Sequence, residues 1–129
     1  MDPNRLKIMV LDDEPIVCKR LKPALEKLGY EVDAFTQSLE AMQEIQETTY
    51  DIIITDLKMK GIDGMKFLQE AKKRSPRTEV IVITGFATLE TAKESFQKGV
   101  FDFIAKPFKL SEIQKVVEQA AAKVRRAAS

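Results

Sequence analysis

Short apolar segments alternate along the chain with amphipathic ones. The clearest apolar segment is 51–56, in which three consecutive isoleucines stand between two aspartates. A continuous run of β-branched residues is typical of a strand that is buried on both faces, as in a parallel sheet covered by helices. Four other segments of strand length have uninterrupted or partly alternating apolar positions. The five predicted strands cover residues 6–11, 30–35, 51–56, 79–83 and 100–105.

Each predicted strand is followed by a segment with the apolar spacing of an amphipathic helix. Pro15 suits the first turn of the first helix, and Gly29 is a typical residue just beyond a helix end. Pro23 lies inside this helix and removes one backbone hydrogen bond, so we expect a kink there. The third helix is expected to stop at Ser75-Pro76, because proline cannot continue a helix.

Polar residues predict where the other helices begin. Ser38 is a favourable N-cap for the second helix, over 39–47, and Thr88 for the fourth. Ser111 and Gln114 have the spacing of a capping box, so the last helix is expected to begin near residue 110 or 111.

Five strand–helix units in succession predict an α/β domain with a doubly wound parallel sheet. Right-handed crossovers restrict the topology of such a sheet further. A chain of 129 residues has the length of one domain and can bury a substantial core. We therefore expect a single domain over 1–129, with its core at about 5–125 and with 126–129 as a tail or the start of a linker.

The composition is that of a globular protein, with 44% hydrophobic and 32% charged residues. The net charge of +1 gives no strong attraction to nucleic acid or to a membrane surface. The apolar runs are too short to span a bilayer, and no signal-peptide pattern opens the chain. The charge and the short apolar runs therefore predict no direct binding to nucleic acid or membrane. Cys18 is the single cysteine and cannot form an internal disulfide, so we expect a cytoplasmic protein.

Polar and charged side chains follow four of the predicted strands. Asp12 and Asp13 follow the first strand, Asp56 the third, Thr84 the fourth and Lys106 the fifth. Each of them alone has an ordinary structural role, as a helix cap, a turn hydroxyl or a solvated charge. The carboxyl ends of parallel strands share one edge of the sheet, so we expect these side chains to lie together.

Neighbouring carboxylates repel one another, and a hard divalent cation relieves this repulsion. Carboxylates and water are the ligands that suit Mg²⁺. Carboxylates, Mg²⁺, a hydroxyl and an ammonium around one centre are the parts of a phosphoryl-transfer site. The sequence contains no histidine, so none of these residues can carry a phosphoryl group on an imidazole.

Four groups of residues carry a resemblance to a known family. They are Leu-Asp-Asp-Glu-Pro at 11–15, Asp56 with Met59 and Asp63-Gly64, Thr84-Gly85, and Asp-Phe-Ile-Ala-Lys-Pro-Phe at 102–108. With these motifs the chain resembles, over about 5–125, the receiver domain of bacterial response regulators in two-component signalling. It is most similar to receivers of the nitrogen-regulator type. The resemblance implies a flavodoxin-like fold, with five helices around a five-stranded parallel sheet of strand order 2-1-3-4-5.

The resemblance also implies how the acidic residues act. Asp56 would accept a phosphoryl group, in a Mg²⁺-dependent transfer from a histidine kinase or a phosphotransfer protein. Asp13, Asp56 and the backbone carbonyl of Lys58 would bind Mg²⁺ directly, and Asp12 would bind it through water.

Other residues would respond to the phosphoryl group or shield it. Lys106 and Thr84 would each contact one of its oxygens. Thr84 and Phe103 would form the switch, in which the aromatic ring turns inward as Thr84 moves. The face built by the fourth helix, the fifth strand and the fifth helix would then bind partners or form a homodimer. Lys58 and Phe86 would control the access of water to the phosphoryl site.

Two positions depart from the usual pattern of the family. Lys60 stands where proline is usual, which predicts a looser loop after Asp56. Phe103 replaces the frequent tyrosine, so the switch residue cannot donate a phenolic hydrogen bond, although it can bury its ring. The family pattern also implies a cis peptide bond at Lys106-Pro107, which the X-Pro sequence permits.

A signalling module of this kind is not an enzyme, beyond catalysing its own phosphorylation and dephosphorylation. Two other classes stay open. An aspartyl-phosphate phosphatase of the haloacid-dehalogenase type also uses aspartate, lysine and Mg²⁺, but its nucleophile lies on the first strand in an Asp-x-Asp pattern, whereas Asp12 and Asp13 are adjacent. A flavodoxin-like FMN binder fits the fold, but a flavin phosphate needs hydroxyls and backbone donors where this chain has carboxylates.

Overall fold

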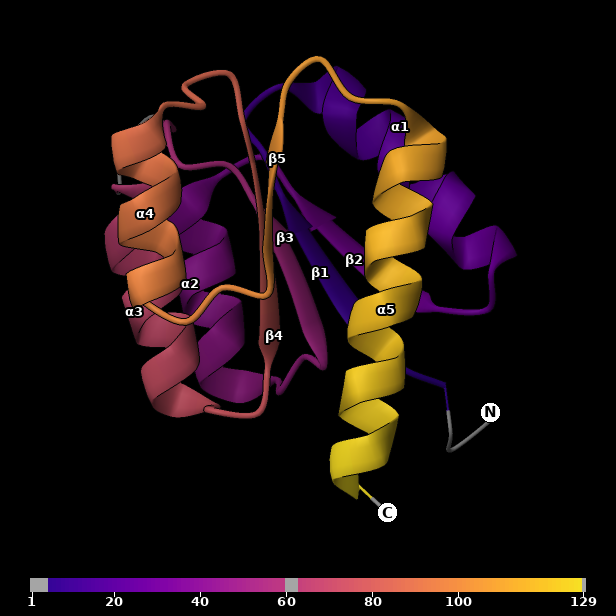
Figure 1. The fold of residues 1–129 in the computed structure, drawn as a ribbon. Coiled ribbons are helices and arrows are strands. Elements are labelled where there is room, and N and C mark those ends of the chain that lie inside the picture. The colour runs from indigo at the N-terminus through magenta and orange to yellow at the C-terminus, as the bar shows by residue number, and fades with distance from the viewer. Residues whose placement is uncertain (1–4, 60–62, 129) are drawn as a thin grey trace.

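A five-stranded parallel sheet forms the centre of the protein, in a computed structural model that describes residues 5–59 and 63–128. The strand order is β2-β1-β3-β4-β5, and all four strand pairs are parallel, as predicted. Helices α1 and α5 cover one face of the sheet, and α2, α3 and α4 lie on the other (Figure 1). The strands are β1 (Lys7–Leu11), β2 (Glu31–Phe35), β3 (Ile52–Thr55), β4 (Glu79–Thr84) and β5 (Asp102–Ala105). The helices are α1 (Pro15–Lys27), α2 (Ser38–Glu47), α3 (Gly64–Arg74), α4 (Leu89–Gln97) and α5 (Leu110–Ala128).

The isoleucines of β3 show how the sheet supports two separate apolar cores. Ile52 and Ile54 belong to the core between the sheet and helices α1 and α5. Ile53 points to the opposite face and belongs to the core formed with α2 and α3. Side chains alternate along a strand, so a central strand with helices on both sides needs apolar residues at every position. This explains why the central strands have continuous apolar runs.

Two helix boundaries agree with the predictions from the sequence, at the start of α4 and at the end of α1. The Thr88 hydroxyl accepts the Thr91 backbone N–H, and Thr91 returns the contact to form a capping box at the start of α4. Gly29 follows α1 with a φ of 98°, a left-handed conformation that glycine adopts without strain. Pro23 lies within α1, which runs on to Lys27, and the expected kink there stays a prediction.

Two predicted caps are wrong. Ser38 is the first residue of α2 rather than its cap, because the Ala41 N–H already donates to the carbonyl of Gln37. Ser111 lies inside the first turn of α5, because the Ile113 N–H donates to the Lys109 carbonyl and the helix begins at Leu110. In both cases the backbone hydrogen bonds begin earlier than a serine cap allows.

The last helix includes residues that we expected to form a tail. α5 extends to Ala128 and buries side chains as far along as Ala121. Whether 126–129 act as a tail or as the start of a linker stays a prediction. Among the described residues, no helix combines the length and the apolar character needed to cross a membrane.

Candidate functional site

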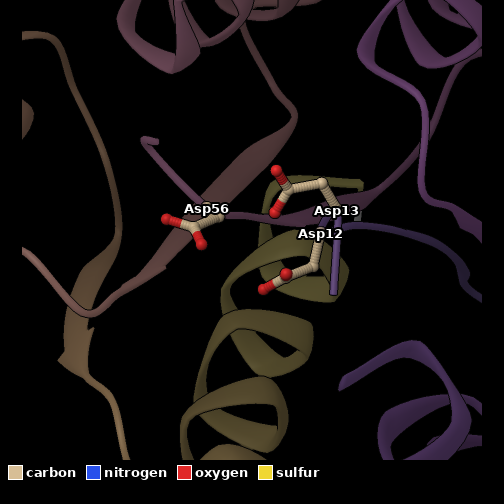
Figure 2. Close-up of side chains that lie close together, drawn as sticks. All are labelled: Asp12, Asp13 and Asp56. Atoms are coloured by element: carbon tan, nitrogen blue, oxygen red, sulfur yellow. The ribbon is translucent and has the colours of Figure 1, made fainter. Parts of the chain in front are cut away.

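Two acidic residues become neighbours because β1 and β3 are paired in parallel. Leu11 at the end of β1 lies opposite Thr55 at the end of β3, so Asp12 and Asp56 leave the sheet side by side. The Asp56 N–H donates to the Leu11 carbonyl at 3.1 Å, which extends the pairing into the loop. Together with Asp13 they form an acidic cluster, in which one oxygen from each carboxylate lies within 4.8 Å of the others (Figure 2).

The side chain of Lys106 reaches into this cluster from the end of β5. Its ammonium lies 2.8 Å from Oδ2 of Asp12, 2.8 Å from Oδ2 of Asp56 and 2.7 Å from Oε1 of Glu14. The backbone N–H of Lys106 donates to the Thr84 carbonyl at 2.8 Å, which fixes the start of the loop after β5. The Lys106-Pro107 peptide bond is cis, as expected.

Burial and charge act in opposite directions on the pKa values in the site. Burial alone would lower the pKa of Lys106, but its hydrogen bonds to Asp12, Asp56 and Glu14 outweigh this effect and raise the pKa. The pKa of Asp12 is also raised, because burial of its carboxyl group outweighs the hydrogen bonds from Lys106 and from the Glu14 backbone. Lys106 therefore stays charged, whereas Asp12 has lost much of the solvation that a carboxylate prefers.

Backbone N–H groups fix the orientation of two of the carboxylates. The Glu14 N–H donates to Oδ1 of Asp12 at 2.9 Å, and the Lys58 N–H donates to Oδ1 of Asp56 at 3.1 Å. In each residue the second oxygen, Oδ2, is thereby turned towards Lys106. Preorganised donors of this kind stabilise negative charge without further rearrangement.

The predicted switch residues lie on adjacent strands. Thr84 ends β4, is fully buried, and accepts the Phe86 N–H on its hydroxyl at 3.0 Å. Phe103 lies in β5 opposite Val82 and is partly buried against the core formed with α2 and α3. Thr84 and Phe103 therefore lie on neighbouring strands, and their role as a switch stays a prediction.

The residues expected to control access lie in two loops at this edge. Lys58 is exposed in the loop after β3, and Phe86 is 56% exposed in the loop after β4. Lys60, whose departure from the family pattern predicted a looser loop, lies outside the described residues. Glu14 is the member of the site that our sequence interpretation missed, because its contact with Lys106 joins residues 92 apart.

The acidic cluster fits a hard divalent cation. Asp12, Asp13 and Asp56 each offer a carboxylate oxygen, and Mg²⁺ binds through a small number of carboxylates together with water. Repulsion among these groups would be relieved by such an ion. The side chains can therefore hold Mg²⁺, while the role of the Lys58 carbonyl as a further ligand stays a prediction.

A parallel sheet of this order, with carboxylates and a lysine at its carboxyl edge, defines an α/β domain of the receiver class. The family model for the response regulator receiver domain matches residues 8–118, and the chain belongs to this family. Members of the family accept a phosphoryl group as parts of two-component systems. Neither a phosphatase of the haloacid-dehalogenase type nor an FMN binder is supported by this match.

Two proteins with similar sequences are named as regulators. The chain is 33% identical over 114 residues to the regulatory protein AtoC of Escherichia coli strain K12, covering 88% of this chain and 25% of AtoC. It is 32% identical over 113 residues to the DNA-binding transcriptional regulator NtrC of the same strain, covering 88% of this chain and 24% of NtrC. The chain thus spans about a quarter of the length of these relatives.

A solved structure of a relative matches the fold almost completely. The solution structure of the beryllofluoride-activated NtrC4 receiver domain dimer is 32% identical, with a TM-score of 0.86. The match covers 92% of this chain and 98% of that chain. The similarity to receivers of the nitrogen-regulator type is therefore confirmed in both sequence and structure.

Proposed function

We propose that Asp56 is the residue that accepts the phosphoryl group. The observation that carries this proposal is the position of its carboxylate, which lies beside the other two acidic residues and 2.8 Å from the ammonium of Lys106. One oxygen of Asp56 would form a bond to phosphorus while the bond from phosphorus to the donor breaks. The leaving group, an imidazole of a phosphorylated histidine or the acetate of acetyl phosphate, takes the electron pair of that bond.

The neighbouring residues would assist this transfer by holding charge. Asp13 and Asp56, with the Lys58 carbonyl, would bind Mg²⁺ directly, and Asp12 would bind it through water. Bound Mg²⁺ would supply positive charge that offsets the carboxylates and the phosphoryl oxygens. Lys106 would donate to one phosphoryl oxygen, and Thr84 would turn its hydroxyl to another.

This part of the proposal concerns the donor of the phosphoryl group and the process that the domain regulates. These 129 residues contain no histidine, so we propose that a histidine kinase or a phosphotransfer protein supplies the phosphoryl group. Because the relatives AtoC and NtrC are regulators of transcription, we propose that this domain regulates such an output in a longer protein. The domain itself would bind neither nucleic acid nor membrane, would act in the cytoplasm, and would catalyse only its own phosphorylation and dephosphorylation.

The response would pass from the phosphoryl group to a protein surface. Movement of Thr84 would open space for the ring of Phe103, and α4 would follow. This two-state change would alter the face formed by α4, β5 and α5, which would then bind a partner or a second copy.

Labelling with acetyl phosphate tests the assignment of Asp56. The protein is incubated with Mg²⁺ and acetyl phosphate, and the mass increment of one phosphoryl group is measured. Asp56→Asn should abolish the increment, whereas Asp102→Asn, which removes an aspartate near the opposite end of β5, should retain it. Equal labelling of the wild type and Asp56→Asn would show that another residue is the acceptor.

A further inference from the structure

The Lys106 ammonium is shared among three carboxylates that differ greatly in exposure. The side chains of Asp12 and Asp56 are 0% and 6% exposed, whereas that of Glu14 is 58% exposed. All three contacts lie between 2.7 and 2.8 Å. Lys106 is therefore held by two buried groups and one surface group.

A lysine ammonium has three N–H donors and no acceptor. Lys106 donates hydrogen bonds to Glu14 and Asp56, and it forms an ion pair with Oδ2 of Asp12 at 2.8 Å. Three carboxylate oxygens at these distances surround the ammonium, so a phosphoryl oxygen can approach Lys106 only if one of them moves away.

The two buried carboxylates are poorly placed to leave. Oδ1 of Asp12 is held by the Glu14 N–H, and a buried Asp12 without Lys106 would lose its compensating charge. Asp56 loses the charge of its carboxylate on phosphorylation, but it stays in place beside Lys106 because it carries the phosphoryl group and its Oδ1 is held by the Lys58 N–H. Glu14, by contrast, can turn its side chain into water, which solvates a carboxylate well.

We propose that Glu14 is a positioning residue that competes with the phosphoryl group for Lys106. Before phosphorylation, Glu14 occupies the Lys106 donor that faces solvent. The phosphoryl group displaces Glu14 and takes over this donor, so each activation includes the loss of one exposed ion pair. This inference rests on the proposed role of Asp56, and it assigns to Glu14 a restraint on how readily the phosphorylated state forms.

Two substitutions separate contact from charge. Glu14→Gln keeps the length of the side chain and removes its charge, and Glu14→Asp keeps the charge but shortens the reach. Glu112→Gln is the matched control, because it removes the charge of an exposed glutamate in the first turn of α5. The same Glu14→Gln change is also made in a Lys106→Met background, which has no ammonium to compete for.

The measurement is the affinity for beryllofluoride, a phosphoryl mimic, in the presence of Mg²⁺, followed by NMR, together with the labelling rate with acetyl phosphate. Glu14→Gln and Glu14→Asp should each tighten binding by about threefold, the scale expected for one exposed ion pair. Glu112→Gln should change it less. In the Lys106→Met background, Glu14→Gln should have no more effect than Glu112→Gln, because coupled residues lose their effect when the partner is absent.

Three results would overturn the inference. The first is an affinity of Glu14→Gln for beryllofluoride that equals the affinity of Glu112→Gln. The second is a gain in affinity from Glu14→Gln that is just as large in the Lys106→Met background. If Lys106→Met binds too weakly to measure, a Glu14→Asp protein with wild-type affinity overturns it, because charge alone then explains the effect. These results can be distinguished from an error in the assignment of Asp56. In that case acetyl phosphate would not label the wild type, or it would label Asp56→Asn equally.

Discussion

The Lys58 ammonium nitrogen lies 5.3 Å from the centre of the Phe86 ring. At this distance a cation over an aromatic face makes a cation–π contact. Lys58 is two residues beyond Asp56 and Phe86 is two residues beyond Thr84, so the contact joins the loops that follow β3 and β4. The pair therefore forms a bridge between two loops at the edge of the sheet that carries the acidic cluster.

We predict that this pair slows the loss of the phosphoryl group. Hydrolysis needs a water molecule in line with the bond between phosphorus and Asp56, and neither an ammonium nor a phenyl ring can act as a general base for it. Lys58→Asn and Phe86→Ala should both accelerate decay, and a tenfold gain requires a barrier lower by only about 1.4 kcal/mol. Decay of the phosphorylated protein is measured in each variant and in the double variant.

Because Lys58 and Phe86 touch, their effects should not add. Lys93→Asn, on the exposed surface of α4, is the control for loss of a lysine charge. Unchanged or slower decay in Lys58→Asn, Phe86→Ala and the double variant would show that this pair does not exclude the attacking water.

Removal of Asp13 should separate metal binding from folding. Asp13 lies in the loop after β1 and is outside both apolar cores, so Asp13→Ala should leave the fold intact. It should abolish measurable Mg²⁺ binding, because one of the three carboxylates of the cluster is lost. Calorimetric titration with Mg²⁺ and a circular dichroism spectrum test the two parts, and wild-type affinity in the variant would reject the assignment.

The buried carboxyl of Asp12 should make the metal-free protein sensitive to pH. Burial raises the pKa of Asp12 above its ordinary value of 3.8, so the folded protein holds this proton where the unfolded chain has lost it. The contribution of Asp12 to stability is therefore present below the ordinary pKa and is lost as the pH rises through the raised value. Asp12→Asn lacks this titration.

The free energy of unfolding of the wild type, relative to Asp12→Asn, should therefore fall as the pH rises above the ordinary pKa of 3.8. Urea unfolding without Mg²⁺ at a series of rising pH values gives this difference. A difference that stays constant or increases with pH would contradict the raised pKa.

Gly64 should be intolerant of any side chain because of its contact with the loop after Asp56. A Cβ atom at this position would lie 2.5 Å from both Cα and the carbonyl oxygen of Leu57, which are backbone atoms that cannot simply rotate away. Gly64→Ala should therefore destabilise the protein by about 1–3 kcal/mol, the usual cost of overpacking. Gly85→Ala is the matched control, because no atom lies within 4 Å of its added Cβ. Thermal unfolding of both variants compares them, and equal midpoints would contradict the steric argument.

The surface of α4 should mediate self-association in the activated state. Leu89 is 85% exposed and Phe96 is 50% exposed, and they lie on the same helix as Ala92. We expect beryllofluoride to increase self-association in sedimentation experiments, and Leu89→Ser to reduce that increase. Leu39→Ser, at an exposed leucine near the start of α2, should not reduce it. Identical sedimentation with and without beryllofluoride, with unchanged NMR shifts near Phe103, would indicate a domain that does not switch.

The sheet and the acidic cluster could be predicted because both depend on short-range patterns. A run such as Ile52-Ile53-Ile54 is typical of a strand covered on both faces, and parallel pairing then brings Asp12 and Asp56 to the same edge. The start of the last helix, expected near residue 110 or 111, agrees with Leu110. The capping roles of Ser38 and Ser111 could not be predicted, because each serine can either cap a helix or stand in its first turn. The contact between Glu14 and Lys106 depends on side-chain conformations across the fold, and neither residue type nor spacing indicates it.

α4 differs from the rest of the domain in how little apolar surface it covers. Along this helix, whose residues are all described, Ser95 is the single buried residue, whereas α5 buries five. Opening α4 would therefore expose little new surface to solvent, so its amide hydrogens should exchange through local fluctuations that depend weakly on denaturant. The strands β1 and β3, buried on both faces, should exchange only when the whole domain unfolds, so a single chain would combine a rigid sheet with one helix that moves at low energetic cost.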